Sequence, residues 1–244
     1  MSKILIKLAW YTFLSVFAPT NKILHKRTKY RNKLTDATNK RKALLDTCKD
    51  LDIKVHKIRM IRGGWNFDFI INDRYVFKIK DGDKFDIKNI VKEKRITDAF
   101  ANIVPLQIPK IEIIHAGQYV FWKYEFINGK NLTKLSLKTI IKNKETWSKQ
   151  IAEFIFAMHN SLPREINDLK DGQGDSWGHN DICNNIIVDT KSMKIVGIID
   201  WEYAGWNFLE TEFKNCTYFS KKLRIAGFDT LIRKEYKNLL KKHK

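Results

Sequence analysis

Residues 179–202 read HNDICNNIIVDTKSMKIVGIIDWE, and two short apolar runs in this stretch decide how the chain is interpreted. Ile186–Val188 and Ile195–Ile199 have the length and the β-branched content of buried strands, and a polar segment connects them. If the two strands pair antiparallel, the start of the first lies beside the end of the second. Asn185 and Asp200 would then meet at one end of a hairpin, with Asp181 close by.

This expected meeting point has the chemistry of a metal site. Two carboxylates and one amide oxygen form the hard-oxygen ligand set that Mg²⁺ prefers, and one carboxylate would remain free to accept a proton. Phosphoryl transfer needs such a set, because the metal neutralises phosphate charge while a positioned aspartate orients the attacking hydroxyl. The alternative is that these are ordinary polar residues at strand ends, but their combination and spacing favour a site.

The N-terminal half offers a lysine and a carboxylate suited to the same chemistry. Phe67–Ile71 and Tyr75–Ile79 predict a tight hairpin, and its second strand carries Lys78. Helical spacing in Ile87–Phe100 places Glu93 on the following helix. A strand lysine held by a helix carboxylate is the arrangement that grips nucleotide phosphates in kinases. The alternatives are a surface lysine and a solvated charged helix face.

Two consecutive glycines precede this hairpin. Gly63 and Gly64 would let the backbone approach a phosphate closely, since glycine has no Cβ. A glycine pair alone is weak evidence, but its position before the strands and Lys78 makes a nucleotide-binding loop the favoured interpretation.

The motifs HNDICNNIIVD and IIDWEYAGWN resemble the choline/ethanolamine kinase and aminoglycoside phosphotransferase superfamily, whose members are relatives of protein kinases. IDWEYAGWN is most similar to the bacterial choline-kinase-like proteins. The resemblance implies that Asp181 is the catalytic base, that Asn185 and Asp200 bind Mg²⁺, and that ATP is the phosphate donor. It also implies that His179 braces the loop. The family places its asparagine five residues after the aspartate, whereas Asn185 follows Asp181 by four, so Asn184 could share the role.

Strand-like patterns fill the first half of the chain and helical patterns fill the second, which indicates two lobes around a cleft. The resemblance implies a two-lobed, protein-kinase-like α+β fold, in which the segment Tyr124–Gly129 is the hinge and Glu125 and Ile127 hold adenine through the backbone. The expected divisions are a basic helical extension at 1–45, a nucleotide-binding N-lobe at 46–127, and a catalytic and substrate-binding C-lobe at 128–244.

The phosphate acceptor remains open between two main candidates. The resemblance favours choline, ethanolamine or a related small amino alcohol, with Glu202, Trp206 and Glu212 as substrate contacts; core packing is the alternative for the aromatic residues. A sugar hydroxyl on lipopolysaccharide or another surface glycan is the second candidate, because few residues follow Asp200 to enclose a substrate. An aminoglycoside is a third, weaker one.

The composition indicates an anionic partner. The chain has 46 Lys and Arg against 27 Asp and Glu, a net charge of +19. We expect no nucleic acid, because no nucleic-acid-binding motif is present and the basic residues are spread over both termini. A kinase-like module that binds nucleic acid or membrane without catalysis is the alternative from another functional class. Three scattered cysteines match no metal site or disulfide framework and favour a reducing cytosol. No pattern indicates the oligomeric state.

The N-terminal segment combines an apolar run with a basic run. Ile4–Ala18 is too short for a spanning helix, which needs about 20 apolar residues, and Pro19 argues against cleavage as a signal peptide. The lysines and arginines of 22–33 follow directly. The pattern fits an interfacial anchor that holds residues 1–34 on an anionic membrane, peripheral on the cytoplasmic face. The alternative is a helix packed on the protein's own core.

Overall fold

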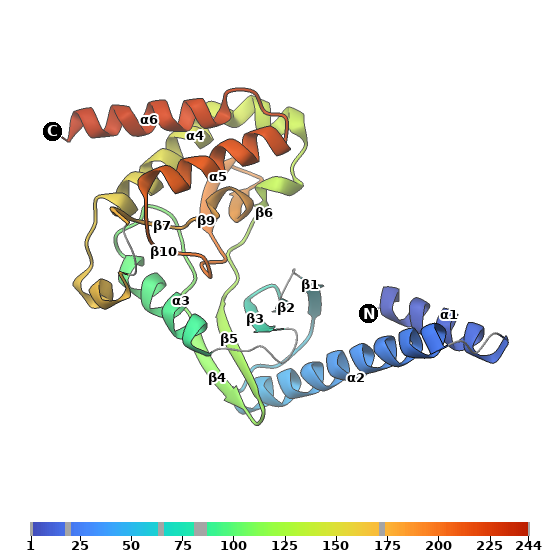
Figure 1. Ribbon diagram of the computed structural model, residues 1–244. Helices are drawn as coiled ribbons and strands as arrows, with labels where there is room; N and C mark the ends of the chain where they lie inside the picture. Colours follow the sequence, from blue (N-terminus) through green and yellow to red (C-terminus); the bar gives the residue numbers. More distant parts are fainter. Residues whose placement is uncertain (1, 18–20, 63–65, 81–86, 171–173, 244) are drawn as a thin grey trace.

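The computed structural model describes residues 2–17, 21–62, 66–80, 87–170 and 174–243. It has a strand-rich N-lobe, a helical C-lobe and a long helical extension that projects from the N-lobe (Figure 1). This arrangement confirms the predicted fold class. Gly63 and Gly64 lie outside the described residues, so the predicted phosphate loop stays a prediction.

The N-lobe is built on one antiparallel sheet of five strands in the order β1-β2-β3-β5-β4. The predicted hairpin is β2–β3, and its turn residues Asn72 and Asp73 have φ of 55° and 53°, the left-handed geometry that matches the twist of the two strands. The strands are β1 (Ile58–Arg62), β2 (Asn66–Ile71), β3 (Tyr75–Lys80), β4 (Glu112–Ala116) and β5 (Tyr119–Glu125).

Two helices contact this sheet. α2 (Asn21–Asp50) packs Leu44 and Cys48 against the phenylalanines of the sheet, and all of these side chains are buried. α3 (Ile87–Phe100) has the bounds that its periodicity predicts. Because α2 continues to Asp50 and its second half belongs to the N-lobe core, the expected boundary between residues 45 and 46 falls inside a helix. Only its first half extends beyond the lobe (Figure 1).

The C-lobe surrounds the predicted β8–β9 hairpin. Ile186 of β8 lies opposite Ile198 of β9, so the antiparallel pairing is confirmed. The strands are β6 (Lys130–Asn131), β7 (Ser176–Gly178), β8 (Ile186–Asp189), β9 (Lys194–Ile198) and β10 (Gly205–Asn207), and the helices are α4 (Leu137–His159), α5 (Leu209–Lys222) and α6 (Phe228–Lys242), with short 3-10 helices η1 (Leu132–Lys134), η2 (Arg164–Leu169) and η3 (Ile182–Asn184).

The core of the C-lobe reaches into the other lobe. Trp147, Trp177 and Trp201 are fully buried in one apolar cluster that joins α4, the two small sheets, α5 and α6. Ile96 and Phe100 at the end of α3 belong to the same cluster. Because α3 packs on the sheet at one end and on the C-lobe at the other, it fixes the two walls of the cleft relative to each other.

The extension is a helical hairpin. α1 (Ser2–Phe17) folds back along the first half of α2 (Figure 1). Tyr11 stacks on Tyr30 with ring centroids 5.6 Å apart, and Arg27 donates a hydrogen bond to the Ser15 hydroxyl. Among the described residues, no helix has the length and apolar character needed to cross a membrane.

Candidate active site

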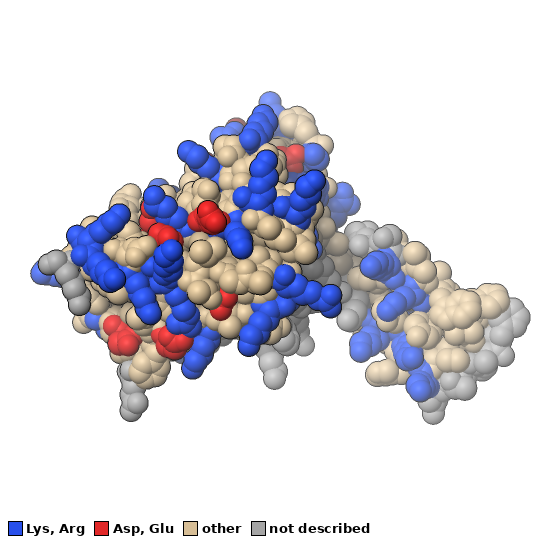
Figure 2. Space-filling model, turned by 90° about the horizontal axis from the view of Figure 1, so that it is seen from above, with Lys and Arg blue, Asp and Glu red and all other residues tan. Residues whose placement is uncertain are grey.

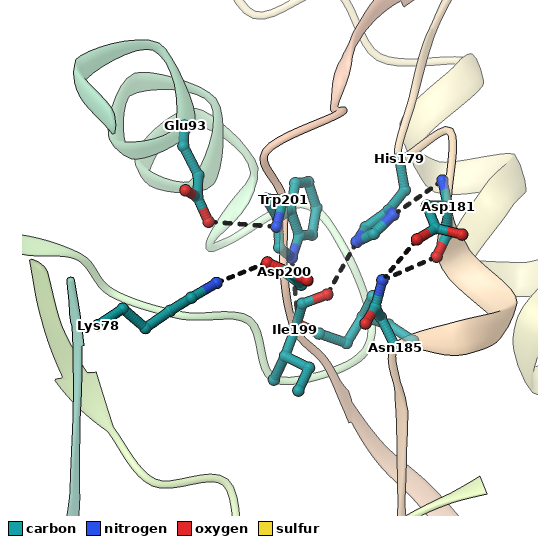
Figure 3. A network of polar contacts seen from close by, with 9 residues as sticks. Lys78, Glu93, His179, Asp181, Asn185, Ile199, Asp200 and Trp201 are labelled. Carbon is teal, nitrogen blue, oxygen red and sulfur yellow. Dashed lines mark hydrogen bonds and ion pairs between the residues drawn. The ribbon is translucent and has the colours of Figure 1, made fainter. Parts of the chain in front are cut away.

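An ion pair joins the two lobes across the cleft. Lys78 Nζ on β3 lies 2.5 Å from Asp200 Oδ1, just beyond the end of β9 (Figure 3). Burial lowers the pKa of Lys78, but the carboxylates of Asp200 and Glu93 outweigh it and hold that pKa above its ordinary value. The lysine therefore carries a full positive charge into the cleft, as the strand pattern predicts.

Glu93 stands behind this pair rather than in it. The side chain is buried, and its Oε1 accepts a hydrogen bond from the backbone N–H of Trp201 at 3.2 Å. Burial raises the pKa of Glu93 to about 7, against the lowering effect of Lys78. Glu93 thus holds the segment that carries Asp200, while Lys78 forms its direct ion pair with Asp200 (Figure 3).

Asp181 is held from two sides by asparagines. Asn184 Nδ2 donates to its Oδ1 at 2.7 Å, and Asn185 Nδ2 donates to its Oδ2 at 3.2 Å. Burial raises the pKa of Asp181. The residues between Asp181 and Asn185 form the single helical turn η3, and this turn brings the Asn185 side chain back to the backbone carbonyl of Asp181. The two asparagines therefore share the support of Asp181, and the shorter spacing is explained by this turn.

His179 is a brace, as expected. Its Nδ1 accepts the backbone N–H of Asp181 at 3.3 Å, which leaves Nε2 to donate to the carbonyl of Ile199 at 3.1 Å. The ring is fully buried, and burial lowers the pKa of His179 to about 4. A neutral imidazole with both nitrogens engaged ties the Asp181 loop to the segment that leads to Asp200 (Figure 3).

The backbone is strained at both ends of this site. Asn180 and Asp200 each have a φ of 64°, in the left-handed region that costs a non-glycine residue about 1 kcal/mol. Such strain persists only where surrounding contacts over-determine it, and it concentrates at functional sites. Here the contacts are the Asn180 side chain, which donates to the carbonyl of Tyr203 at 3.0 Å, and the Lys78 ion pair of Asp200.

Glu212 does not lie where a substrate contact is predicted. It is buried beneath the loop, and its Oε2 accepts the backbone N–H of Asn180 at 2.8 Å. Burial raises the pKa of Glu212 to about 7. Asn215, one turn later on α5, donates to the carbonyl of Asn180. The prediction of a substrate contact is therefore corrected: Glu212 is buried beneath the loop that carries Asp181 and supports that loop through Asn180.

The aromatic cluster near Asp200 is largely engaged. Trp201 is fully buried against Phe154 and His179. Trp206 donates from Nε1 to the carbonyl of Gly174 at 2.6 Å, and Lys170 Nζ lies 4.4 Å from its ring centroid. Core packing therefore explains Trp201, and one face of Trp206 already holds a cation.

The rim of the site carries Glu202 and Tyr203. Tyr203 is 57% exposed, and the charge of Glu202 is the main cause that raises the pKa of Tyr203. The two side chains therefore lie close enough for the Glu202 charge to act on the Tyr203 hydroxyl. They lie directly after the Asp200 segment, where an acceptor could reach them.

Two thiols lie under the loop. Cys183 of η3 and Cys216 of α5 are buried, with their sulfur atoms 3.4 Å apart. The hydrogen bond to Cys216, followed by burial, raises the pKa of Cys183. A protonated, enclosed thiol is not a nucleophile. The structure therefore gives no reason to assign Cys183 a nucleophilic role.

A cavity of about 420 Å³ opens between the N-lobe sheet and the C-lobe. Its volume suits a small-molecule ligand. Ile127 lines it, as the hinge prediction requires, whereas the Glu125 side chain is exposed at the end of β5. Gly129 also lines it, and the position suits glycine because a Cβ there would meet the Ile187 side chain at 2.6 Å and the Val188 carbonyl oxygen at 2.7 Å. The apolar walls are Ile70, Val76, Tyr124, Phe126, Ile127, Ile187 and Ile199.

Asp68 is a site residue that the sequence analysis missed. It lies directly opposite Lys78 on β2 and lines the same cavity, and its Oδ1 is buried with no hydrogen-bond partner. Burial raises the pKa of Asp68 to about 6, against the lowering effect of Lys78. The signal was available, because the hairpin turn at Asn72 and Asp73 fixes a register that pairs residue 68 with residue 78.

Comparisons with known proteins agree with this geometry. Residues 142–235 match the model of the phosphotransferase enzyme family. Aminoglycoside phosphotransferase APH(2'')-Ib with bound ADP is 16% identical and superposes with a TM-score of 0.55, covering 80% of this chain and 85% of its own. The macrolide 2'-phosphotransferase MphH from Brachybacterium faecium is 10% identical, with a TM-score of 0.58 and coverages of 80% and 82%. No curated protein matches the sequence.

A third structure, a GDP and kanamycin complex of an APH(2'') enzyme, superposes with a TM-score of 0.61 at 14% identity, covering 76% of this chain and 78% of its own. At such identities a structural likeness shows the fold alone. The predicted likeness to the phosphotransferases is confirmed in the fold and in the pattern of residues 142–235, and the closer likeness to choline kinases stays a prediction. The chain therefore has the protein-kinase-like fold of the aminoglycoside and macrolide phosphotransferases, and its residues 142–235 carry the pattern of the phosphotransferase enzyme family.

Proposed function

We propose that this protein transfers the γ-phosphate of ATP to an alcohol hydroxyl. One observation carries the proposal: Asp181, Asp200 and Lys78 come from separate segments and converge at one end of the β8–β9 hairpin (Figure 3). Buried charges are costly unless they are paired or have a function. The loop that carries Asp181 is held in place by a histidine, two asparagines and a buried glutamate. Such precise positioning of one aspartate supports catalysis rather than simple binding.

Asp181 is the proposed catalytic base. Burial raises the pKa of Asp181, which brings it closer to the range in which a carboxylate accepts a proton efficiently. The bonds from Asn184 and Asn185 fix the direction of its two oxygens. Asp181 would orient the acceptor hydroxyl and take its proton as the phosphate transfers.

Asp200 and Asn185 fit a magnesium ion. The Asp200 side chain is 35% exposed toward the cleft, and Asn185 uses Nδ2 for both of its bonds to Asp181, so that Oδ1 is the atom it can offer a cation. Bound there, Mg²⁺ would neutralise charge on the phosphates of ATP. The ammonium of Lys78 already lies against Asp200, and this contact supports the proposal that the position attracts a cation.

The cavity beside this ion pair is the proposed nucleotide pocket. Its apolar walls suit a purine base, and the hinge backbone near Glu125 and Ile127 would hold the adenine edge. Lys78 would bind the α- and β-phosphates at the inner end. The predicted approach of Gly63 and Gly64 to the phosphates concerns residues outside the described part of the chain and stays a prediction.

A sugar hydroxyl on an anionic glycan is the acceptor that the contacts favour. A quaternary ammonium needs open aromatic faces, but Trp201 is buried and Lys170 covers one face of Trp206. The chain also has a net charge of +19, which favours an acceptor that carries negative charge.

A small amino alcohol, such as ethanolamine or choline, is the second candidate, because one feature supports it. Exposed Tyr203 and the carboxylate of Glu202 are neighbours at the rim, and together they could receive one ammonium group. Replacing Glu202 by glutamine would weaken transfer to ethanolamine and leave transfer to a neutral sugar unchanged, which separates the two candidates.

The test compares Asp181→Asn with Asp98→Asn, the same chemical change on the outer surface of α3. We expect Asp181→Asn to lower kcat by about 10²–10⁴-fold, the usual contribution of a general base, while Asp98→Asn keeps wild-type activity. The assay supplies ATP or GTP with lipopolysaccharide, choline, ethanolamine or an aminoglycoside. Wild-type activity in Asp181→Asn would overturn the mechanism. Binding to nucleic acid that weakens steeply with salt, with no transfer to any acceptor, would favour the non-catalytic class.

A further inference from the structure

The outer face of α1 is apolar and exposed. Its five large side chains are between 45% and 72% exposed, and they recur along one side of the helix. Trp10 and Phe13 stack on each other with ring centroids 6.3 Å apart, so they form one continuous aromatic surface. Contiguous apolar surface of this kind marks an interaction site rather than ordinary exposure. We call it the α1 face; its members are Leu5, Ile6, Trp10, Phe13 and Val16.

The opposite side of α1 is already used. Tyr11 stacks on Tyr30 of α2, and Ser15 is buried and accepts a hydrogen bond from Arg27. Lys26 lies over the Tyr11 ring at 5.3 Å from its centroid. These contacts fix the rotation of α1 about its own axis. The α1 face therefore cannot turn inward without breaking the hairpin, so folding does not cover it.

The hairpin is also strongly basic. The residues before Asp36 include no acidic side chain and eight basic ones: Lys3, Lys7, Lys22, Lys26, Arg27, Lys29, Arg31 and Lys33. Figure 2 shows cations beside uncharged surface on the extension, at the right of the view. An apolar face flanked by cations complements a surface with apolar interior and anionic exterior.

We propose that α1 lies in the interface of an anionic lipid bilayer, with the α1 face in the acyl region and the flanking lysines and arginines on the headgroups. α1 has 16 residues, about 24 Å at 1.5 Å per residue, which is too short to span a hydrocarbon core of about 30 Å. A helix of this length lies in the membrane plane. Tryptophan suits the headgroup level, since its ring has both apolar and polar parts.

A bilayer explains the α1 face better than a second copy of the chain does. Two copies that joined through this face would bring two sets of eight cations together without any acidic residue of the first 35 positions to offset them. Like charges placed together oppose association. Anionic lipid removes that repulsion and covers the apolar surface at the same time.

This proposal goes beyond the proposed function, and the two can fail separately. Vesicle binding needs no ATP or acceptor, so Asp181→Asn should bind vesicles like the wild type. The measurement is co-sedimentation of the full chain with vesicles of phosphatidylcholine alone or of an equal mixture of phosphatidylcholine and phosphatidylglycerol. We expect binding to the mixture, weak binding to phosphatidylcholine, and loss of binding as salt is raised.

The decisive variant is Trp10→Glu with Phe13→Glu, which should reduce the partition coefficient on the mixed vesicles by about 100-fold or more. It removes two aromatic rings that would enter the acyl region and adds two charges that anionic lipid repels. The matched control is Ile141→Glu with Leu162→Glu, exposed apolar residues of the C-lobe, which should reduce binding only slightly. Equal binding by the two double variants would overturn the proposal. Sedimentation velocity provides the other refutation: a wild-type dimer that Trp10→Glu with Phe13→Glu dissociates, with no vesicle binding, would assign the α1 face to a second copy.

Discussion

The loop that carries Asp181 and the N-terminal hairpin depart in opposite ways from the usual pattern, in which polar side chains face water and apolar side chains are buried. Under the loop, polar groups that normally face water are buried: His179 and Glu212 are at most 2% exposed. On the hairpin, side chains that normally seek the interior face outward, and Trp10 and Ile6 are 58% and 68% exposed. Both arrangements cost free energy when the protein is alone in water.

The difference lies in how each region offsets that cost. The buried groups of the loop find partners within the chain, such as the Asn180 N–H for Glu212 and the Ile199 carbonyl for His179. Among the described residues, the α1 face receives no such cover from the lobes, and its proposed partner lies outside the chain. The first region therefore meets most of its needs within the chain, although Glu212 Oε1 and Asn180 Oδ1 are buried without a hydrogen-bond partner, and we propose that the second is covered by a lipid surface.

The largest expected effect on stability concerns a partly buried histidine of the C-lobe. His159, at the end of α4, has its pKa lowered by burial to about 4, while an unfolded histidine titrates near 6.5. The unfolded chain thus binds more protons between these values, so this histidine makes stability fall as pH drops through that window, by up to about 3 kcal/mol.

Replacing His159 by glutamine should remove that contribution. The measurement is urea unfolding of wild type and His159→Gln from pH 7 to pH 4, in which the difference between their unfolding free energies should shrink as pH falls. Comparing the two proteins cancels the opposite slopes of Glu93 and Glu212, whose pKa values are raised. A constant difference across the range would show that His159 titrates normally in the folded protein.

A smaller effect would test the corrected role of Glu212. Glu212→Gln places an amide donor among the backbone N–H groups that the carboxylate accepts, and we expect it to lose about 2 kcal/mol of stability. Because the side chain supports the loop, kcat should fall while the KM for the acceptor stays near wild type. The control is Glu210→Gln, an exposed residue of α5 that pairs with Arg233 of α6, which should change stability by less than about 1 kcal/mol. If Glu212→Gln instead raised the KM for the acceptor and left kcat and stability normal, the original prediction that Glu212 contacts the substrate would be correct.

The smallest expected effect belongs to the hairpin. Trp10→Glu with Phe13→Glu should change the melting temperature and the kcat for a soluble acceptor very little, because exposed substitutions usually stay within about 0.5 kcal/mol. Thermal denaturation without vesicles measures this directly. A large loss of stability would mean that the α1 face packs on the protein itself, and the contrast between the two regions would disappear.

Local patterns were sufficient for much of the fold. The β8–β9 hairpin and the helix Ile87–Phe100 were predicted from apolar periodicity, because each element buries one continuous stripe. Lys78, Asp181 and Asp200 followed from strand ends and from the motif, and the structure brings the three together. Residues whose position depends on a single strand or turn are the ones that a sequence can place.

Residues whose role depends on distant packing were harder to predict. Glu212 looked like a substrate contact because it follows the motif, but α5 packs it beneath Asn180. The expected boundary near residue 45 lies inside α2, because Leu44 and Cys48 continue the apolar stripe of this helix onto the N-lobe sheet. Asp68 was missed although its register with Lys78 was within reach of the hairpin pattern.

The three cysteines make the motions of both lobes observable. Cys48 lies between α2 and the N-lobe sheet, and Cys183 and Cys216 lie between the catalytic loop and α5, all buried. A thiol reagent can react with an enclosed cysteine only when the structure around it opens. The labelling rate of Cys48 therefore reports how often α2 separates from the sheet, and that of the other two reports how often the loop lifts from α5. The native cysteines thus allow local opening to be measured separately in the N-lobe and in the C-lobe.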